Sequence, residues 1–244
     1  MTTSSFRHLD PRIFDRNWDA LSFHHPHLAD RICRVLGIED GRSAPELSQI
    51  PPLDDINDVL VAGKGTVVAT RDDGTHAEII GPQWTRTSRQ ASRKAIVKNP
   101  SRILFVFSCG DFSLLDDCDS LIGFDQRAIV MIEQEAILFL AALAMRDRTD
   151  ILSHPNLFFC VGNDYDLQLQ DLCRQSAFEV LPPSQMTAVA GAGFAFPDDR
   201  ERYLGSIRSF LAKLAEAHND FNAKLQVFFH DLSHPRQLDR KSVV

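Results

Sequence analysis

The chain has 244 residues, of which 44% are hydrophobic and 24% charged, a composition typical of a soluble globular protein with one large domain or two small ones. Its net charge of −7 argues against nucleic acid as a partner, because binding a phosphate backbone requires a basic surface. There is no apolar run long enough for a membrane span, no secretory signal, and no paired spacing among the five cysteines, so we expect a cytoplasmic protein with reduced thiols.

Residues 1–98 are predicted to form a cap that begins with two amphipathic helices. In residues 10–23, apolar side chains recur at helical spacing after a proline that suits a first turn. Pro26 interrupts this pattern, and a second apolar stripe follows that is expected to end near Gly37.

The cap is predicted to continue with a turn-rich connection over residues 40–55 and a β-hairpin. The hairpin strands are expected at residues 66–70 and 75–80, joined by a turn that contains glycine. Residues 84–98 form the one basic stretch in an acidic chain, which we interpret as a solvated helix face, with an anion-binding face as the alternative.

Residues 99–196 are predicted to form a Rossmann-like α/β domain with a parallel sheet, which makes the fold class α/β. Three short apolar runs read as strands buried on both faces, and a run of strong helix formers over residues 135–145 lies between the second and third. The strands are expected at residues 103–108, 128–133 and 157–162, with a fourth at Phe178 to Leu181.

A ligand of this domain would bind beyond the carboxyl ends of the strands. Gly110, Glu133, Asn163 and Asp164 follow the three strands in turn and are the candidate binding residues. Glu133 follows Gly110 at about the 20-residue spacing at which an acidic residue binds ribose hydroxyls in nucleotide-binding folds. The loop has one glycine where the dinucleotide fingerprint has three, so a purely structural sheet stays the alternative.

Three other motifs are interpreted as structural. His24 and His27 are separated by a proline that breaks their helical alignment, and His230 and His234 lack the glutamate and third ligand of a zinc site. The glycines of residues 191–193 lack the lysine of a phosphate loop. We therefore expect no metal ligands, and we single out no catalytic residue.

Residues 197–238 are predicted to form a long helix whose apolar stripe follows the helical period. The last apolar residues of the stripe have no evident partner in the sequence, and we expect them to pack against a domain that the sequence lacks. These residues are Phe221, Leu225, Phe228 and Phe229.

Two stretches together resemble the amino-terminal half of the motility accessory factor (Maf) family of bacterial flagellin glycosyltransferases: residues 17–32 and residues 128–165. The downstream domain of that family is shared with proteins labelled 6-hydroxymethylpterin diphosphokinase MptE-like, so that label also fits. The family pattern has an asparagine, a His-Pro pair, and later a strand ending in Ile-Glu, an Arg-Asp pair and Val-Gly-x-Asp. The matching positions here are Asn17, His25-Pro26, Ile132-Glu133, Arg146-Asp147 and Val161-Gly162-Asn163-Asp164.

The resemblance implies an enzyme that transfers a nonulosonic acid from a CMP-sugar to Ser or Thr of flagellin. This chain departs from the family in two places. Residues 108–112 replace a Gly-x-Gly-x-Gly loop, and the Gly-Pro-Ser-Leu segment that opens the catalytic portion is absent. In addition, residues 239–244 match the translation of a sequencing adapter, so we expect the natural protein to continue beyond Leu238.

The sequence therefore predicts a non-catalytic amino-terminal region of a Maf-like glycosyltransferase, with flagellin and a missing catalytic domain as partners. The first alternative is a methyltransferase-like domain that binds S-adenosylmethionine through Gly110, Glu133 and Asn163 or Asp164. The second is a pure interaction module that uses its amphipathic helices. Whether the chain is an enzyme in its own right stays open.

Overall fold

A computed structural model describes residues 11–38, 44–45, 56–62, 66–71, 74, 76–80, 90, 92–98, 102–116, 128–176, 178, 181, 186–190 and 197–233. Every structural statement below concerns these residues.

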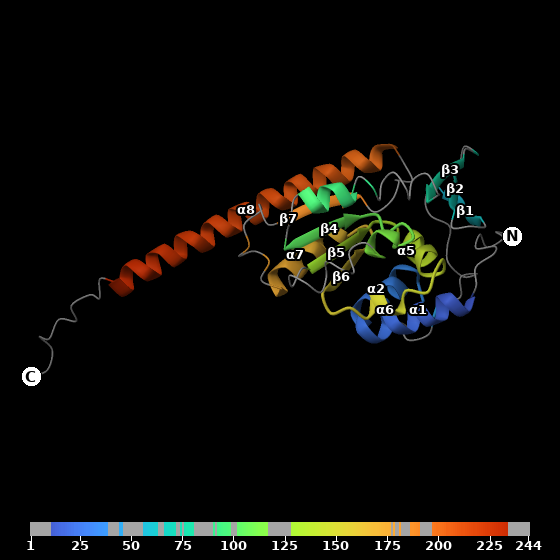
Figure 1. Ribbon diagram of the computed structural model, residues 1–244, viewed down its shortest axis with the longest axis horizontal. Coiled ribbons are helices and arrows are strands. Elements are labelled where there is room, and N and C mark those ends of the chain that lie inside the picture. Colours follow the sequence, from blue (N-terminus) through green and yellow to red (C-terminus); the bar gives the residue numbers. More distant parts are fainter. Residues whose placement is uncertain are drawn as a thin grey trace, which may run out of the picture.

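The centre of the molecule is a four-stranded parallel sheet in the order β6-β5-β4-β7, which confirms the predicted α/β, Rossmann-like fold (Figure 1). All residues of the two central strands are buried, because helices cover both faces of the sheet. The strands are β4 (Ile103–Phe107), β5 (Ala128–Glu133), β6 (Leu157–Val161) and β7 (Met186–Ala190).

The fourth strand lies later in the chain than predicted. Phe178 and Leu181 are not in a strand, and β7 pairs in parallel with β4 from Met186 to Ala190. The aromatic side chain of Phe178 is buried against Phe158 instead, with the two ring centroids 6.0 Å apart. The small residues of β7 suit a strand at the edge of the sheet, where less apolar area is available to pack.

The alternation of side chains along the strands creates two apolar cores, one on each face. Leu104, Val106 and Ile129 face the first core, which is covered by four helices: α1 (Pro11–His24), α2 (Pro26–Val35), α5 (Ala136–Leu143) and α6 (Thr149–Leu152). Phe105 and Val130 face the second core, which is covered by α7 (Tyr165–Gln175) and α8 (Pro197–Ser233).

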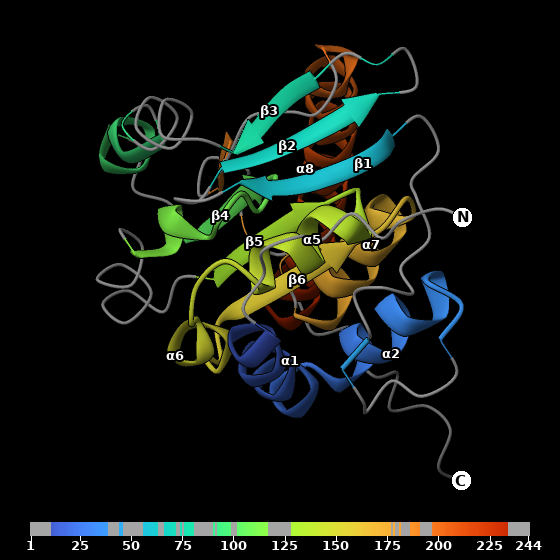
Figure 2. The ribbon, with the colours of Figure 1, turned by 90° about the vertical axis from the view of Figure 1, so that its right-hand side faces the viewer.

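Both predicted amino-terminal helices are present, and they pack on the sheet as a cap (Figure 2). The end of α2 is also as expected, since Gly37 adopts a positive φ of 72° directly after the helix. The amide of Ile38 then donates to the carbonyl of Cys33 at 2.8 Å, which completes the turn that a left-handed glycine permits.

The predicted hairpin is part of a three-stranded antiparallel sheet in the order β1-β2-β3. The hairpin strands β2 (Thr66–Arg71) and β3 (His76–Ile80) confirm the prediction, whereas the additional strand β1 (Ile56–Ala62) was missed. Two polar residues near the start of β1, Asn57 and Asp58, obscured its alternating pattern in the sequence.

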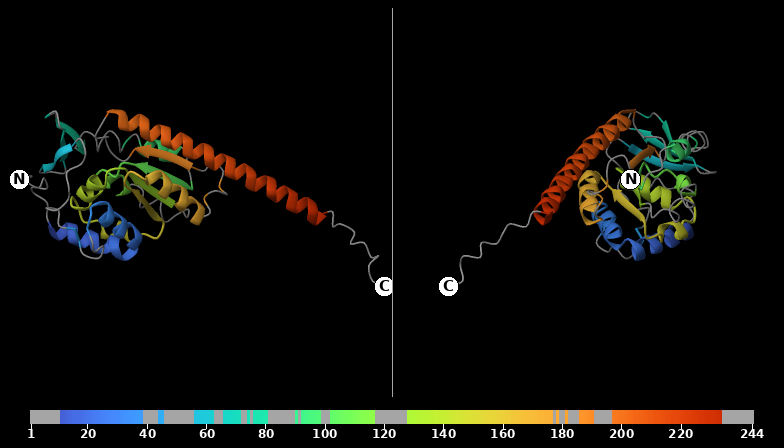
Figure 3. Two further views of the ribbon diagram at one scale, coloured as in Figure 1. Left: turned by 180° about the vertical axis from the view of Figure 1, so that it is seen from behind. Right: turned by 60° about the vertical axis from the view of Figure 1, so that its left-hand side comes forward.

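Helix α8 packs on the second core with its first half and extends away from the rest of the molecule with its second half (Figure 3). Phe210 and Leu214 are buried, but Phe221 is 39% and Val227 62% exposed. The expected apolar stripe is therefore solvent-exposed at Phe221, while the side chains of residues 228–229 lie outside the description. None of the described helices combines the length and the apolar character that crossing a membrane requires.

Candidate functional site

The strand order reverses at β4, because β5 and β6 lie on one side of β4 and β7 on the other. Ligands of open α/β sheets bind at such a reversal, beyond the carboxyl ends of the strands. The loop after β4 and the ends of β5 and β6 therefore define the candidate site. Gly110, Glu133, Asn163 and Asp164 all lie at this edge, as their sequence positions predicted.

The loop after β4 has an unusual backbone. Ser108, Gly110 and Phe112 adopt positive φ angles of 62°, 56° and 57°, of which only the glycine does so without steric cost. Left-handed backbone costs an ordinary residue about 1–2 kcal/mol, so surrounding contacts must hold this loop in place. Asp111 supplies one of them, since its carboxylate accepts a hydrogen bond from the amide of Ser113 at 2.9 Å.

Glu133 supplies several further contacts, because its carboxylate points into this loop. Its Oε2 accepts hydrogen bonds from the amide of Cys109 at 3.1 Å, the Ser108 hydroxyl at 3.2 Å and the Cys109 thiol at 3.4 Å. Its Oε1 accepts one from the amide of Glu135 at 3.2 Å. The end of β5 is thereby tied to the loop after β4.

The environment of Glu133 favours its neutral form. The side chain is 2% exposed, and no cationic side chain pairs with it among the ion pairs of the described residues. Burial raises the pKa of Glu133 to about 7, although the hydrogen bonds from the Cys109 and Glu135 amides oppose this rise. Burial and the adjacent Glu133 charge also raise the pKa of the Cys109 thiol, so this cysteine is not an activated nucleophile.

These contacts bear on the predicted role of Glu133. An acidic residue that binds ribose must present its carboxylate to the crevice, whereas here the loop donors already surround it. Binding of a ribose by Glu133 would therefore require the loop to open. The assignment of Gly110 and Glu133 to a cofactor stays a prediction.

Asn163 and Asp164 are exposed after β6, where a ligand can reach them. The side-chain amide of Gln134 donates to Asn163 Oδ1 at 3.2 Å. Asp164 is the N-cap residue of α7 as predicted, but its side chain makes no capping hydrogen bond. Its carboxylate pairs instead with Arg31 at 2.6 Å and accepts a hydrogen bond from Gln168 at 2.8 Å.

A second polar cluster joins α1 to the segment between α5 and α6. Asn17 is fully buried, and its amide nitrogen donates to the carbonyls of Leu143 at 2.6 Å and Arg146 at 2.5 Å. Its Oδ1 accepts a hydrogen bond from the amide of Arg148 at 2.7 Å. The contact was missed, although a signal was present, because Asn17 lies on the same helical face as Phe14 and Leu21.

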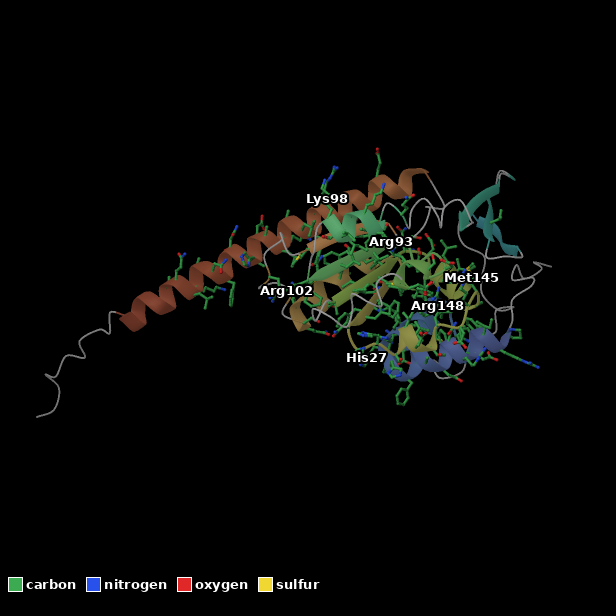
Figure 4. All side chains as sticks on the ribbon, in the orientation of Figure 1. His27, Arg93, Lys98, Arg102, Met145 and Arg148 are labelled. Atoms are coloured by element: carbon green, nitrogen blue, oxygen red, sulfur yellow. The ribbon has the colours of Figure 1, made fainter. Side chains whose placement is uncertain are left out.

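Arg148 extends this cluster toward the loop after β4 (Figure 4). Arg148 is 6% exposed, and its guanidinium forms an ion pair with Asp116 and donates to the carbonyl of Asp111 at 3.2 Å. Arg146 lies 3.7 Å from the buried carboxylate of Asp111. The contacts of Arg148 with Asp116 and with the carbonyl of Asp111 help to position the loop.

The amino-terminal histidines have structural contacts. His25 Nε2 lies 3.0 Å from the carbonyl of Leu152, and its ring packs edge-on against Phe159 with the centroids 5.1 Å apart. Burial lowers the pKa of His25. Among the described residues there is no group of three or more His, Cys, Asp or Glu side chains that could hold a metal ion, and residue 234 lies outside them.

Comparison with known proteins leaves the site to be interpreted from its own geometry. No family model, no curated protein and no solved structure matches this chain.

Proposed function

We propose that this chain is the non-catalytic amino-terminal region of a Maf-like glycosyltransferase that modifies Ser or Thr of flagellin with a nonulosonic acid. In this role, the α/β domain and its helical cap form one rigid body that organises the enzyme or docks flagellin. The observation that supports the proposal is that the carboxylate of Glu133 is surrounded by donors of the protein itself.

The residues that carry the resemblance to the family are also the residues that connect the cap to the α/β domain. Asn17 binds the segment from Leu143 to Arg148, and His25 contacts the carbonyl of Leu152. Two exposed ion pairs add to these contacts, one between Arg16 and Asp147 and one between Arg31 and Asp164. These contacts support a structural role for the residues that carry the resemblance.

The buried groups support a role without chemistry. A general acid or base must reach a substrate within hydrogen-bond distance, but Glu133 is 2% exposed and is surrounded by donors of the protein itself. The Ser108 hydroxyl donates to Glu133, so it too is engaged in a contact inside the protein.

The test is a transfer assay with the purified 244-residue chain, a CMP-linked nonulosonic acid and unmodified flagellin, read by intact mass. A full-length Maf glycosyltransferase serves as the positive control. We expect flagellin to keep its unmodified mass in the presence of this chain. A mass increase that depends on the chain would show that it is itself a transferase.

A further inference from the structure

A groove between α7 and α8 lies on the face of the sheet opposite to the face toward which Glu133 points. Its main part is a cavity of about 300 Å³, and it continues into a smaller cavity of about 130 Å³ that shares three of its lining residues. The shared residues are Gln170, Phe210 and Lys213. Small-molecule sites begin at about this volume.

One residue of the groove lies at the carboxyl edge of the sheet, where ligands of this fold bind. Phe107, the last residue of β4, forms part of its lining, so the groove lies beside the point at which the strand order reverses. The groove lies outside the Glu133 contacts, and none of the residues predicted to bind a cofactor lines it.

A hydrogen bond joins the two helices that line the groove. The Tyr165 hydroxyl donates to Ser206 Oγ at 2.8 Å and joins the first turn of α7 to α8. Below this contact, Phe107, Leu169 and Phe210 form an apolar floor, and Phe210 is held by an edge-to-face contact with Phe105 at 5.6 Å between centroids.

The groove has an acidic residue toward one end and a basic residue toward the other. Asp166 lines it at the beginning of α7, whereas Lys213 lies two helical turns beyond Ser206 on α8, a distance of about 10 Å along the helix axis. Arg174 lines the smaller cavity together with Lys213. Asp171 lies 3.9 Å from Arg174 and offsets part of the charge of this arginine. An elongated ligand therefore meets a carboxylate at one end and cations at the other.

We propose that this groove binds a nucleoside monophosphate. The phosphate pairs with Lys213, the ribose lies beside Gln170 and Ser209, and the base contacts the apolar floor with its N–H donors directed to Asp166. A base with adjacent N–H donors, such as guanine, matches a carboxylate best. The rise of about 10 Å along α8 from Ser206 to Lys213 is comparable with the length of such a ligand. This inference stands independently of the transferase proposal.

The experiment is calorimetric titration of the full chain with GMP, UMP and ribose 5-phosphate. The variants are Lys213→Gln, which removes the proposed phosphate contact, and Ser209→Trp, which fills the groove from an exposed helix position. Lys224→Gln is the control, because Lys224 is an exposed lysine of α8 beyond the groove.

We expect GMP to bind more tightly than UMP, and Lys213→Gln to weaken GMP binding by about tenfold, as for loss of a charge-assisted contact. Ser209→Trp should abolish binding, and Lys224→Gln should leave it unchanged. Three results would overturn the proposal: no nucleotide binds at millimolar concentration, Lys213→Gln binds like the wild type, or ribose 5-phosphate binds as tightly as GMP.

Discussion

At the scale of single residues, the most consequential side chain is Glu133, a buried carboxylate that holds a strained loop. Its Oε2 accepts hydrogen bonds from the Ser108 hydroxyl and the Cys109 amide. These two bonds stabilise the left-handed backbone of Ser108. The same burial that excludes water also disfavours the charged form of the carboxylate.

This environment predicts a specific pH dependence of stability. Burial raises the pKa of Glu133 from 4.5 to about 7, so between these values the folded state binds a proton that the unfolded state has lost. The contribution of Glu133 to stability is therefore fully present below pH 4.5 and is lost as the pH rises through about 7. At about 1.4 kcal/mol for each pH unit, the free energy of unfolding should decrease by about 3 kcal/mol.

Urea denaturation at pH 5 and pH 8 of the wild type and Glu133→Gln measures this contribution, because the variant removes only one titrating group. Other groups, including His25 with its lowered pKa, titrate in both proteins and cancel in the comparison. Glu201→Gln, at an exposed position of α8, is the control. An equal pH dependence in wild type and Glu133→Gln would contradict the burial argument.

The sequence predicted the position of Glu133 but not the direction of its carboxylate. A buried apolar run that ends in a glutamate places that residue at the carboxyl edge of a parallel sheet. Its partners, however, depend on a loop in which Ser108 and Phe112 adopt left-handed backbone. That backbone is imposed by tertiary contacts, and a pattern search looks for it only at glycine.

At the scale of elements, the attachment of α1 to the α/β domain depends on Asn17. Asn17→Ala removes three hydrogen bonds and leaves the buried amide of Arg148 without its acceptor. We expect it to lower the free energy of unfolding by about 2–4 kcal/mol, measured by urea denaturation.

Asn219→Ala is the matched control for this variant, because Asn219 is exposed on α8. It should change stability by less than about 0.5 kcal/mol. If Asn17→Ala were as stable as this control, the cap would be held by apolar packing alone.

Elements with strong periodicity were predicted well, and those without it were not. An apolar stripe at helical spacing identifies α1 and α2, because each helix buries one face. A continuous apolar run identifies β4, β5 and β6, because these strands are covered on both faces. The strand β7 consists mainly of small residues at a sheet edge, so the more apolar Phe178 to Leu181 was chosen in its place. The position of Asn17 on the apolar face of its helix indicates that it is buried, but its hydrogen-bond partners lie more than 120 positions away and could not be predicted.

At the scale of the whole molecule, the fold separates two surfaces. The cap formed by α1 and α2 closes one face of the sheet, whereas α8 covers the other face and then extends into solvent with Phe221 and Val227 exposed. The far part of α8 therefore presents exposed apolar side chains, whereas the Glu133 carboxylate is enclosed by donors of the protein itself.

The most direct test of this account is functional replacement. A chimera in which residues 11–196 of this chain replace the corresponding region of an active Maf glycosyltransferase is incubated with a CMP-linked nonulosonic acid and flagellin, and flagellin is measured by intact mass. The account predicts that the chimera modifies flagellin and that Asn17→Ala, by loosening the cap, reduces the modification. A chimera that folds with the stability of its parent but leaves flagellin unmodified would contradict the assignment.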